Sequence, residues 1–109
     1  MFARSVSMRL KTNSVPEFTR TFENDVLPVL RKQAGFRDEI TFVHNGVEAV
    51  GISLWDQKVQ AETYDRETYP QILKSLAKVV DGTPKVETYE VCNSTAHQIA
   101  AKGLEIVSK

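Results

Sequence analysis

The sequence contains one cysteine, Cys92, and two histidines among its 109 residues. A single cysteine allows no internal disulfide and cannot supply a cysteine-rich zinc site. The histidines, His44 and His97, lie far apart in the sequence and add no metal-ligand spacing. The sequence therefore predicts neither a disulfide scaffold nor a metal site, and Cys92 is expected to be a small apolar filler.

The sequence also lacks an excess of positive or negative charge, because 14 Lys and Arg residues balance 14 Asp and Glu residues. This balance leaves no electrostatic footprint for nucleic acid or for an anionic membrane. No apolar run approaches the ~20 residues of a membrane span, and the start MFARSVSMRLKT lacks the apolar segment of a signal peptide. We therefore expect a cytoplasmic protein without nucleic-acid or membrane partners.

A length of 109 residues fits one domain, and a hydrophobic content of 41% is ordinary for a globular protein. A domain this short is often only marginally stable alone. Association with a second copy of the chain would be one remedy.

The first part of the chain predicts a strand and a helix. In residues 2–10, FARSVSMRL, side chains alternate, so that Phe2, Val6, Met8 and Leu10 share one side with Arg4. From residue 14 onward the apolar residues recur at helical spacing. They are Val15, Phe18, Phe22, Val26 and either Val29 or Leu30.

Local signals frame this helix. Ser14 and Glu17 match a capping box, and Pro16 suits the first turn. Gly35 can adopt the left-handed conformation that ends a helix. Pro28 lies inside the pattern and is expected to kink the helix or to split off its last turn.

Two strand-like runs flank His44-Asn45-Gly46, and Asn-Gly is a strong signal for a hairpin turn. We interpret His44 as a solvated turn residue. The second run carries Val50, Ile52 and Leu54 on one face and Val47, Ala49, Gly51, Ser53 and Trp55 on the other. Neither face is charged in the middle of this strand, which is typical of a strand covered on both sides.

Residues 56–82 predict a helix in two parts. Asp56 can cap the first part, and Thr68 can cap the second, with Pro70 in its first turn. Gly82 is expected to end the helix, and TPKVETYEV then gives a fourth strand.

The predicted order is β-α-β-β-α-β, the α+β ferredoxin-like unit with a four-stranded antiparallel sheet. Residues 1–91 make up this domain. Residues 92–109 form a tail that is expected to hold a short helix, capped by Ser94 or Thr95, and to dock on the domain or on a partner subunit. Two helices cover one face of the sheet, so the apolar second face predicts a homodimer in which two sheets pack together.

The layout, the Gly-Phe that opens the second strand, and the SLW that precedes an acidic residue and the second helix resemble the antibiotic biosynthesis monooxygenase family. The resemblance covers residues 2–91. It implies a dimeric α+β barrel and an oxygenase that acts on a small aromatic or quinol-type compound without a cofactor. The superfamily also contains heme-degrading enzymes and members of no known activity. The fold alone therefore does not fix the function.

The heme-degrading branch can be tested residue by residue. Its members resemble one another in a strand-one asparagine, a tryptophan within helix two and an iron-ligating histidine further along that helix. Here residues 2–10 contain no asparagine, Trp55 precedes the helix, and residues 56–80 contain no histidine. Heme degradation is therefore not expected.

Four residues are candidates for a pocket: Arg4, Trp55, Tyr64 and Tyr69. In the oxygenases that the chain resembles, the protein supplies a dry pocket, a base and orienting polar groups. Arg4 would orient an anion and the aromatic rings would form the walls, while no base can be named. The alternative is a non-catalytic dimeric module that binds a small ligand or serves a structural or stress role.

Each candidate also has a purely structural interpretation. Trp55 can pack a strand end onto a helix, and the two tyrosines can be core rings with solvated hydroxyls. A buried Arg4 needs a charged partner, for which the candidates are Glu39, Glu87 and Glu90. Asp65, Arg66 and Glu67 are interpreted as a solvated helix face.

Overall fold

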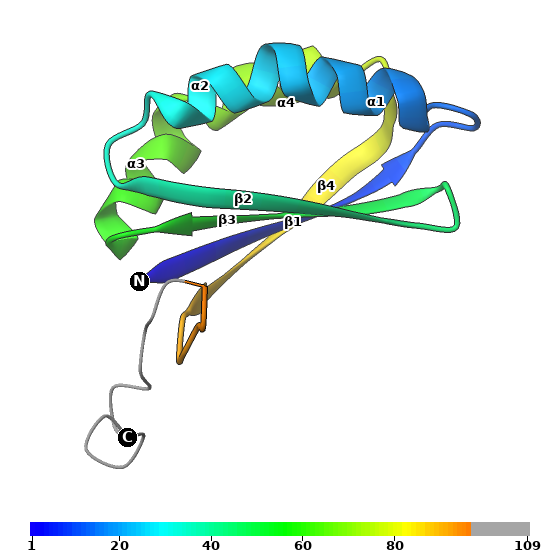
Figure 1. Cartoon of the computed structure of the whole chain (residues 1–109). Helices are drawn as coiled ribbons and strands as arrows, with labels where there is room; N and C mark the ends of the chain where they lie inside the picture. Colours follow the sequence, from blue (N-terminus) through cyan, green and yellow to red (C-terminus); the bar gives the residue numbers. More distant parts are fainter. Residues whose placement is uncertain (97–109) are drawn as a thin grey trace.

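The computed structural model describes residues 1–96, which form a sheet and a set of helices (Figure 1). The elements are β1 (Phe2–Leu10), α1 (Val15–Thr21), the π-helix η1 (Phe22–Val26), α2 (Leu27–Arg31), β2 (Phe36–His44), β3 (Glu48–Trp55), α3 (Lys58–Glu67), α4 (Tyr69–Leu76) and β4 (Val80–Glu90). The short helix expected after Ser94, and His97 with it, lie outside the described residues.

The four strands form one antiparallel sheet in the order β2-β3-β1-β4. The helices all lie on one face of this sheet, and the other face carries no helix of the described chain (Figure 1). This arrangement is the ferredoxin-like α+β fold, so the predicted fold class is confirmed.

The strand register decides which side chains share the space under the helices. Residues directly opposite each other on paired strands point to the same face of a sheet. Glu39 lies opposite Ser53, and Ser53 lies opposite Arg4. Glu39, Ser53 and Arg4 therefore form a polar row across three strands on the helix-covered face. Gly51, which has no side chain, lies in the next row.

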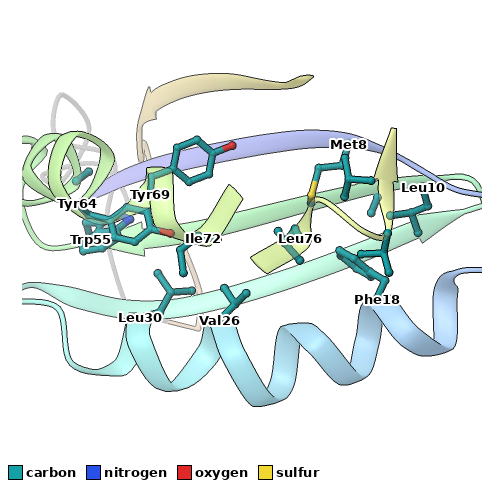
Figure 2. Close-up of a cluster of buried hydrophobic side chains, with 14 residues drawn as sticks. Met8, Leu10, Phe18, Val26, Leu30, Trp55, Tyr64, Tyr69, Ile72 and Leu76 are labelled. Carbon is teal, nitrogen blue, oxygen red and sulfur yellow. The ribbon is translucent and has the colours of Figure 1, made fainter. Parts of the chain in front are cut away.

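The hydrophobic core fills the space between this face and the helices (Figure 2). Trp55 is completely buried, and Phe18 and Val26 are 1% exposed. Leu30 rather than Val29 completes the buried stripe of the first helical region. The expected apolar stripe is thus present and faces the sheet.

The first helical region continues through Pro28 by changing its hydrogen-bond pattern. The Leu27 N–H donates to the Phe22 carbonyl, five residues back, which is the spacing of a π-helix. Pro28 has no N–H and lies in the first turn of α2, where none is needed. Pro28 is thus accommodated by a π-helical turn that sets α2 apart from α1, while the helical backbone continues. The capping box is not formed, because the Ser14 hydroxyl donates to the Thr12 carbonyl.

The hairpin turn has the conformation that Asn-Gly favours. Asn45 and Gly46 have φ values of 53° and 70°, and the Val47 N–H donates to the His44 carbonyl at 3.2 Å. Positive φ at both central residues matches the right-handed twist of the flanking strands. His44 is exposed at the end of β2, as expected. Gly35, at φ 80°, also takes the left-handed conformation predicted for it.

Three local predictions in the second half are wrong. The residue that caps α3 is Gln57, whose N–H is bound by the Gln60 side chain, while Asp56 pairs with Arg37. Gly82 does not end a helix: it lies within β4 at φ 69°, where the pairing with β1 shifts register. Such a bulge uses the conformational freedom of glycine. Cys92 is exposed and is not a core filler.

Two further features of the described chain bear on function classes. None of the helices within residues 1–96 is long and apolar enough to cross a membrane. Within the same residues, no group of three or more His, Cys, Asp and Glu side chains is placed to hold a metal ion.

Candidate functional site

A narrow cavity lies between the helix-covered face of the sheet and the helices. Its volume is about 40 Å³. Its wall is largely apolar, with five residues that carry polar side-chain atoms. The polar ones are Arg4, Glu39, Ser53, Tyr64 and Tyr69, and the apolar ones are Val6, Met8, Phe22, Val26, Leu30, Gly51, Ile72 and Leu76.

Arg4 supplies the positive charge of this cavity. Its side chain is only 3% exposed, and its Nη2 and Nε donate to Asp65 Oδ1 at 2.6 and 3.2 Å. The expectation of an ion pair is correct, but the partner is Asp65 on α3 and not one of the three predicted glutamates. Asp65 therefore does not belong to a merely solvated face, although its side chain is 52% exposed. A buried guanidinium needs such a partner because its desolvation is costly.

Two tyrosines stack around the Arg4 guanidinium. Its central carbon lies 4.0 Å from the centroid of the Tyr69 ring and 5.2 Å from that of Tyr64. Both distances are in the range of cation–π attraction. Burial raises the pKa of Tyr64 to about 12 and also raises the pKa of Tyr69, while the Arg4 charge works in the opposite direction at both.

The Tyr69 hydroxyl is buried and makes no hydrogen bond of normal geometry with a described residue, although the Arg4 guanidinium approaches it and partly offsets the rise in its pKa that burial causes. Buried hydroxyls are normally paired, because an unpaired one loses its bonds to water without compensation. A polar ligand atom in the cavity would supply the missing partner. This hydroxyl and the Arg4 charge therefore mark one polar end of the cavity.

Trp55 supports the site from behind and does not line the cavity. The centroid of its ring lies 5.1 Å from that of the Tyr64 ring (Figure 2) and 5.6 Å from that of the Phe36 ring. Its Nε1 donates to Ser53 Oγ at 2.9 Å. The packing interpretation of Trp55 therefore describes its position, since it holds Tyr64 and Ser53 in place.

Glu39 is the site residue that sequence reasoning missed as a functional group. Its Oε2 accepts a hydrogen bond from Thr41 Oγ1 at 2.6 Å and lies above Gly51, where an added Cβ would come within 3.2 Å of it. Burial is the main reason that the pKa of Glu39 is raised; the Thr41 bond lowers it, and the charge of Asp38 raises it further. A carboxyl group with a raised pKa at a cavity is a common feature of catalytic sites.

The alternation of β2 gave a signal that could have placed Glu39. Glu39 and Thr41 are two residues apart, so they share a strand face, and Gly51 and Ser53 do the same on β3. The register that brings the two pairs together follows from the hairpin. What the sequence does not show is that this face is the one under the helices.

A wider groove lies outside the cavity, along the edge of β2. The groove has a volume of about 220 Å³, against about 40 Å³ for the cavity. It is lined by Phe18, Thr19, Phe22, Glu23, Leu27, Glu39, Thr41 and Val43. Phe22 and Glu39 belong to both walls, so they stand between the groove and the cavity.

The structure brings all four predicted site residues together, but in two roles. Arg4, Tyr64 and Tyr69 line the cavity, and Trp55 packs behind Tyr64. A fixed cation beside a buried phenol can stabilise an oxyanion, because water competes weakly in a dry site. A carboxyl group on the same face can exchange a proton with a ligand. The arrangement therefore suits a largely apolar molecule with an acidic hydroxyl group.

Comparison with solved structures finds this fold in other proteins. A protein of unknown function from Nitrosomonas europaea has a TM-score of 0.73 at 12% identity, over 86% of this chain and 91% of that one. The monooxygenase ActVA-Orf6 of Streptomyces coelicolor, solved with nanaomycin D, has a TM-score of 0.72 at 13% identity, over 85% and 88%. SnoaB, a cofactor-independent oxygenase of Streptomyces nogalater, has 0.71 at 11%, over 86% and 95%.

The chain thus has the fold of the antibiotic biosynthesis monooxygenases, and the recognition made from its sequence is confirmed at the level of fold. Neither the protein-family models nor the curated proteins give a match to the sequence. Because one fold supports several activities, the chemistry has to be argued from the residues of the cavity.

Proposed function

We propose that this chain, which has the fold of the antibiotic biosynthesis monooxygenases, is a cofactor-independent oxygenase of a small aromatic or quinol-type compound. The observation that carries the proposal is the buried Arg4 guanidinium beside the buried hydroxyl of Tyr69 in a largely apolar cavity. This pair would bind the oxygen of a phenol or enol and stabilise its anion. The anion is the electron-rich form that reacts with oxygen.

The apolar wall supports the same substrate class. Aliphatic and aromatic side chains on both sides of the cavity favour a flat ring system over a sugar or a peptide. The cavity of about 40 Å³ is far smaller than a ring system, so lining side chains have to move when it binds. Met8 and Phe22 are suited to this movement, since methionine is flexible and Phe22 begins the π-helix.

We also propose that the working form is a homodimer joined through the helix-free face of the sheet. This face carries apolar side chains on three strands, at exposures that include 47% for Ile40, 54% for Phe42 and 51% for Tyr89. Exposed apolar patches of this kind mark interaction surfaces. Packing two such faces together would bury them and enclose both sheets.

A ligand screen combined with oxygen uptake tests the proposed function. Phenols, anthrones and naphthoquinols at 100 times their dissociation constant should stabilise the chain by about 2.7 kcal/mol, visible as a rise in melting temperature. The class that binds should also support oxygen consumption. Flavin and heme serve as comparison ligands for which no stabilisation is expected.

Arg4→Gln is the informative variant, and Arg37→Gln is its matched control. Both arginines pair with an aspartate, but Arg37 lies on the surface, away from the cavity. Loss of an oxyanion-stabilising group is expected to lower the rate by about 10²-fold in Arg4→Gln, and Arg37→Gln should keep the wild-type rate. Ligand binding that is unchanged in a folded Arg4→Gln would contradict the proposal.

The narrowness of the cavity favours one alternative, a non-catalytic dimeric module that binds a small ligand. A space of about 40 Å³ holds one or two water molecules without rearrangement. In that case an aromatic compound could stabilise the protein without any oxygen uptake. Binding without oxygen uptake would therefore favour the module over the oxygenase.

A further inference from the structure

We propose that Glu39 is the general base of this site, taking the proton from the acidic hydroxyl or enol of the substrate whose anion Arg4 stabilises. This inference rests on the proposed oxygenase function and adds the residue that the sequence could not name. The step is a proton transfer. The O–H bond of the substrate breaks, its electron pair stays on the substrate oxygen, and the proton forms an O–H bond on the Glu39 carboxylate.

The position of Glu39 is the first argument. It lies in one row with Ser53 and Arg4 across three strands, on the face that the helices cover. Two strand spacings separate Glu39 from Arg4, which is about 10 Å between their α-carbons. A flat molecule of two or three fused rings spans such a distance. One acidic hydroxyl can then face Glu39 while a second oxygen faces Arg4 and Tyr69. Because the rings conjugate the two oxygens, the second one shares the negative charge that loss of the proton leaves behind.

The second argument is the space made for the carboxyl group. Gly51 lies beneath Glu39 Oε2, and a Cβ at that position would come within 3.2 Å of this oxygen. The Thr41 hydroxyl donates to the same oxygen at 2.6 Å and fixes it. Thr41 is the one side-chain donor to this carboxylate within residues 1–96, which leaves its other lone pairs available to accept a proton from a ligand. Glu39 is therefore oriented, and no salt bridge within the same residues neutralises it.

The third argument is access. Glu39 and Phe22 line both the outer groove and the inner cavity, so a molecule that moves from one to the other passes this carboxyl group. Asp65 is not suited to this role, because it is bound by Arg4 and does not line the cavity. Glu23 lies in the outer groove but does not line the cavity.

The charged and titratable groups around Glu39 come from several elements. Asp38 precedes Glu39 on β2, and Arg4 lies in the same row on β1. Tyr64 of α3 and Tyr69 of α4 line the same cavity. Glu23 of η1 lines the groove. Burial and the Asp38 charge raise the pKa of Glu39, and the Thr41 bond opposes them. A raised pKa makes a carboxylate a better acceptor of a phenolic proton.

The test is the pH profile of kcat/KM for oxygen uptake with dithranol, a dihydroxyanthrone, after subtraction of the uncatalysed oxidation. The wild type should show an acid limb, because protonated Glu39 cannot act as a base. Glu39→Gln keeps the size of the side chain and should lower kcat/KM by about 10²–10⁴-fold and abolish that limb. Glu62→Gln removes an exposed carboxylate of α3 that lines neither the cavity nor the groove, and it should keep the wild-type profile.

Thr41→Val tests the base through the pH of the acid limb, which would not change if the role of Glu39 were purely structural. Without the Thr41 bond the charged form of Glu39 loses stabilisation, so its pKa rises and the acid limb moves to higher pH. This variant also keeps the test decisive if Glu39→Gln does not fold.

The outcomes separate the two proposals. Oxygen uptake by the wild type that persists in Glu39→Gln, with the acid limb unchanged, overturns the role of Glu39 and leaves the oxygenase function standing. An acid limb that does not move in Thr41→Val also overturns it. No oxygen uptake by the wild type with any phenol, anthrone or naphthoquinol overturns the oxygenase function, and the base with it.

Discussion

At the scale of single residues, the site depends on how one buried charge is compensated. Arg4 is held by Asp65 from one side and covered by the rings of Tyr69 and Tyr64 from the other. The arrangement desolvates the guanidinium but leaves the Tyr69 hydroxyl without a hydrogen bond of normal geometry to any described residue. A buried polar group in this state needs an explanation, and a polar ligand atom would supply one.

The pKa of Tyr64 predicts how stability depends on pH. Its phenol has a pKa of about 12 in the folded chain, against 10.0 as its ordinary value. The folded state binds this proton more tightly, so the associated stability is fully present below pH 10 and is lost as the pH rises toward 12. Urea unfolding across this window should show the unfolding free energy falling by about 2–3 kcal/mol.

Tyr64→Phe is the control for this prediction, because it removes the titrating group and keeps the ring. Its unfolding free energy should fall less than that of the wild type over the same window. Parallel curves for the two proteins would assign the alkaline loss to other residues.

At the scale of elements, Arg4 and Asp65 join strand β1 to helix α3. The helix lies on the same face of the sheet as the other helices (Figure 1), and its ion pair with β1 adds to the ring contacts of Tyr64. The π-helix has a comparable role on the opposite wall, where Phe22 and Val26 line the cavity. Irregular helical turns of this type often occur at functional sites.

Asp65→Asn tests the link between β1 and α3. The substitution keeps the shape of the side chain but removes the charge that faces a buried guanidinium. Since Asp65 is half-exposed and water can replace part of the interaction, we expect the unfolding free energy to fall by about 1–2 kcal/mol.

Glu67→Gln is the matched control for Asp65→Asn, because its pair with Arg66 is exposed on the same helix. It should change the unfolding free energy by no more than about 0.5 kcal/mol. Equal effects of the two substitutions, measured by urea unfolding, would show that the Arg4–Asp65 pair stabilises the fold no more than an exposed ion pair does.

At the scale of the whole molecule, one layer of helices covers one face of the sheet and leaves the other face to solvent or to a partner. The uncovered face carries Ile40 and Phe42 on β2 and Tyr89 on β4. Burial of such side chains stabilises an assembly by about 25 cal/mol for each Å² of apolar surface. A dimer would therefore remedy the small core that a chain of 109 residues can build.

Light scattering at micromolar concentration measures this directly, with an expected mass of about twice the 12.3 kDa of the chain. Phe42→Glu places a charge on the proposed interface and should shift the mass toward that of one chain. Val59→Glu alters an equally exposed apolar residue on α3 and should leave the mass unchanged. A wild-type protein that is monomeric throughout would contradict the dimer.

Local patterns in the sequence were sufficient for the order of the elements. Alternation identified strand β1, Asn45-Gly46 identified the hairpin, and Pro28 marked the irregular helix, because each depends on residues close together in the chain. The same locality explains the errors: Asp56 and Gln57 are both plausible caps, and Gly82 suits a helix end as well as a bulge. Only the pairing of β4 with β1 decides the second case.

The sequence was sufficient to name most residues of the candidate site, but not to say which of them contact one another. Arg4 was conspicuous because it interrupts an apolar strand face, and the same pattern required a buried partner. That this partner is Asp65 depends on where α3 lies over the sheet, and no spacing along the chain determines that position. Glu39 was inconspicuous because a glutamate on an edge strand is usually solvated, and burial came only with the helices.

By itself, the sequence determined the α+β ferredoxin-like order, the apolar faces and the residues from which a cavity could be built. Hydrophobic periodicity and turn chemistry act between neighbours in the chain, so one sequence is enough to read them. The tertiary structure alone decided that Arg4, Tyr69 and Glu39 share one cavity, that Trp55 stands behind it, and how wide it is. Those properties depend on strand register and on helix placement, which are set by packing between residues far apart in the chain.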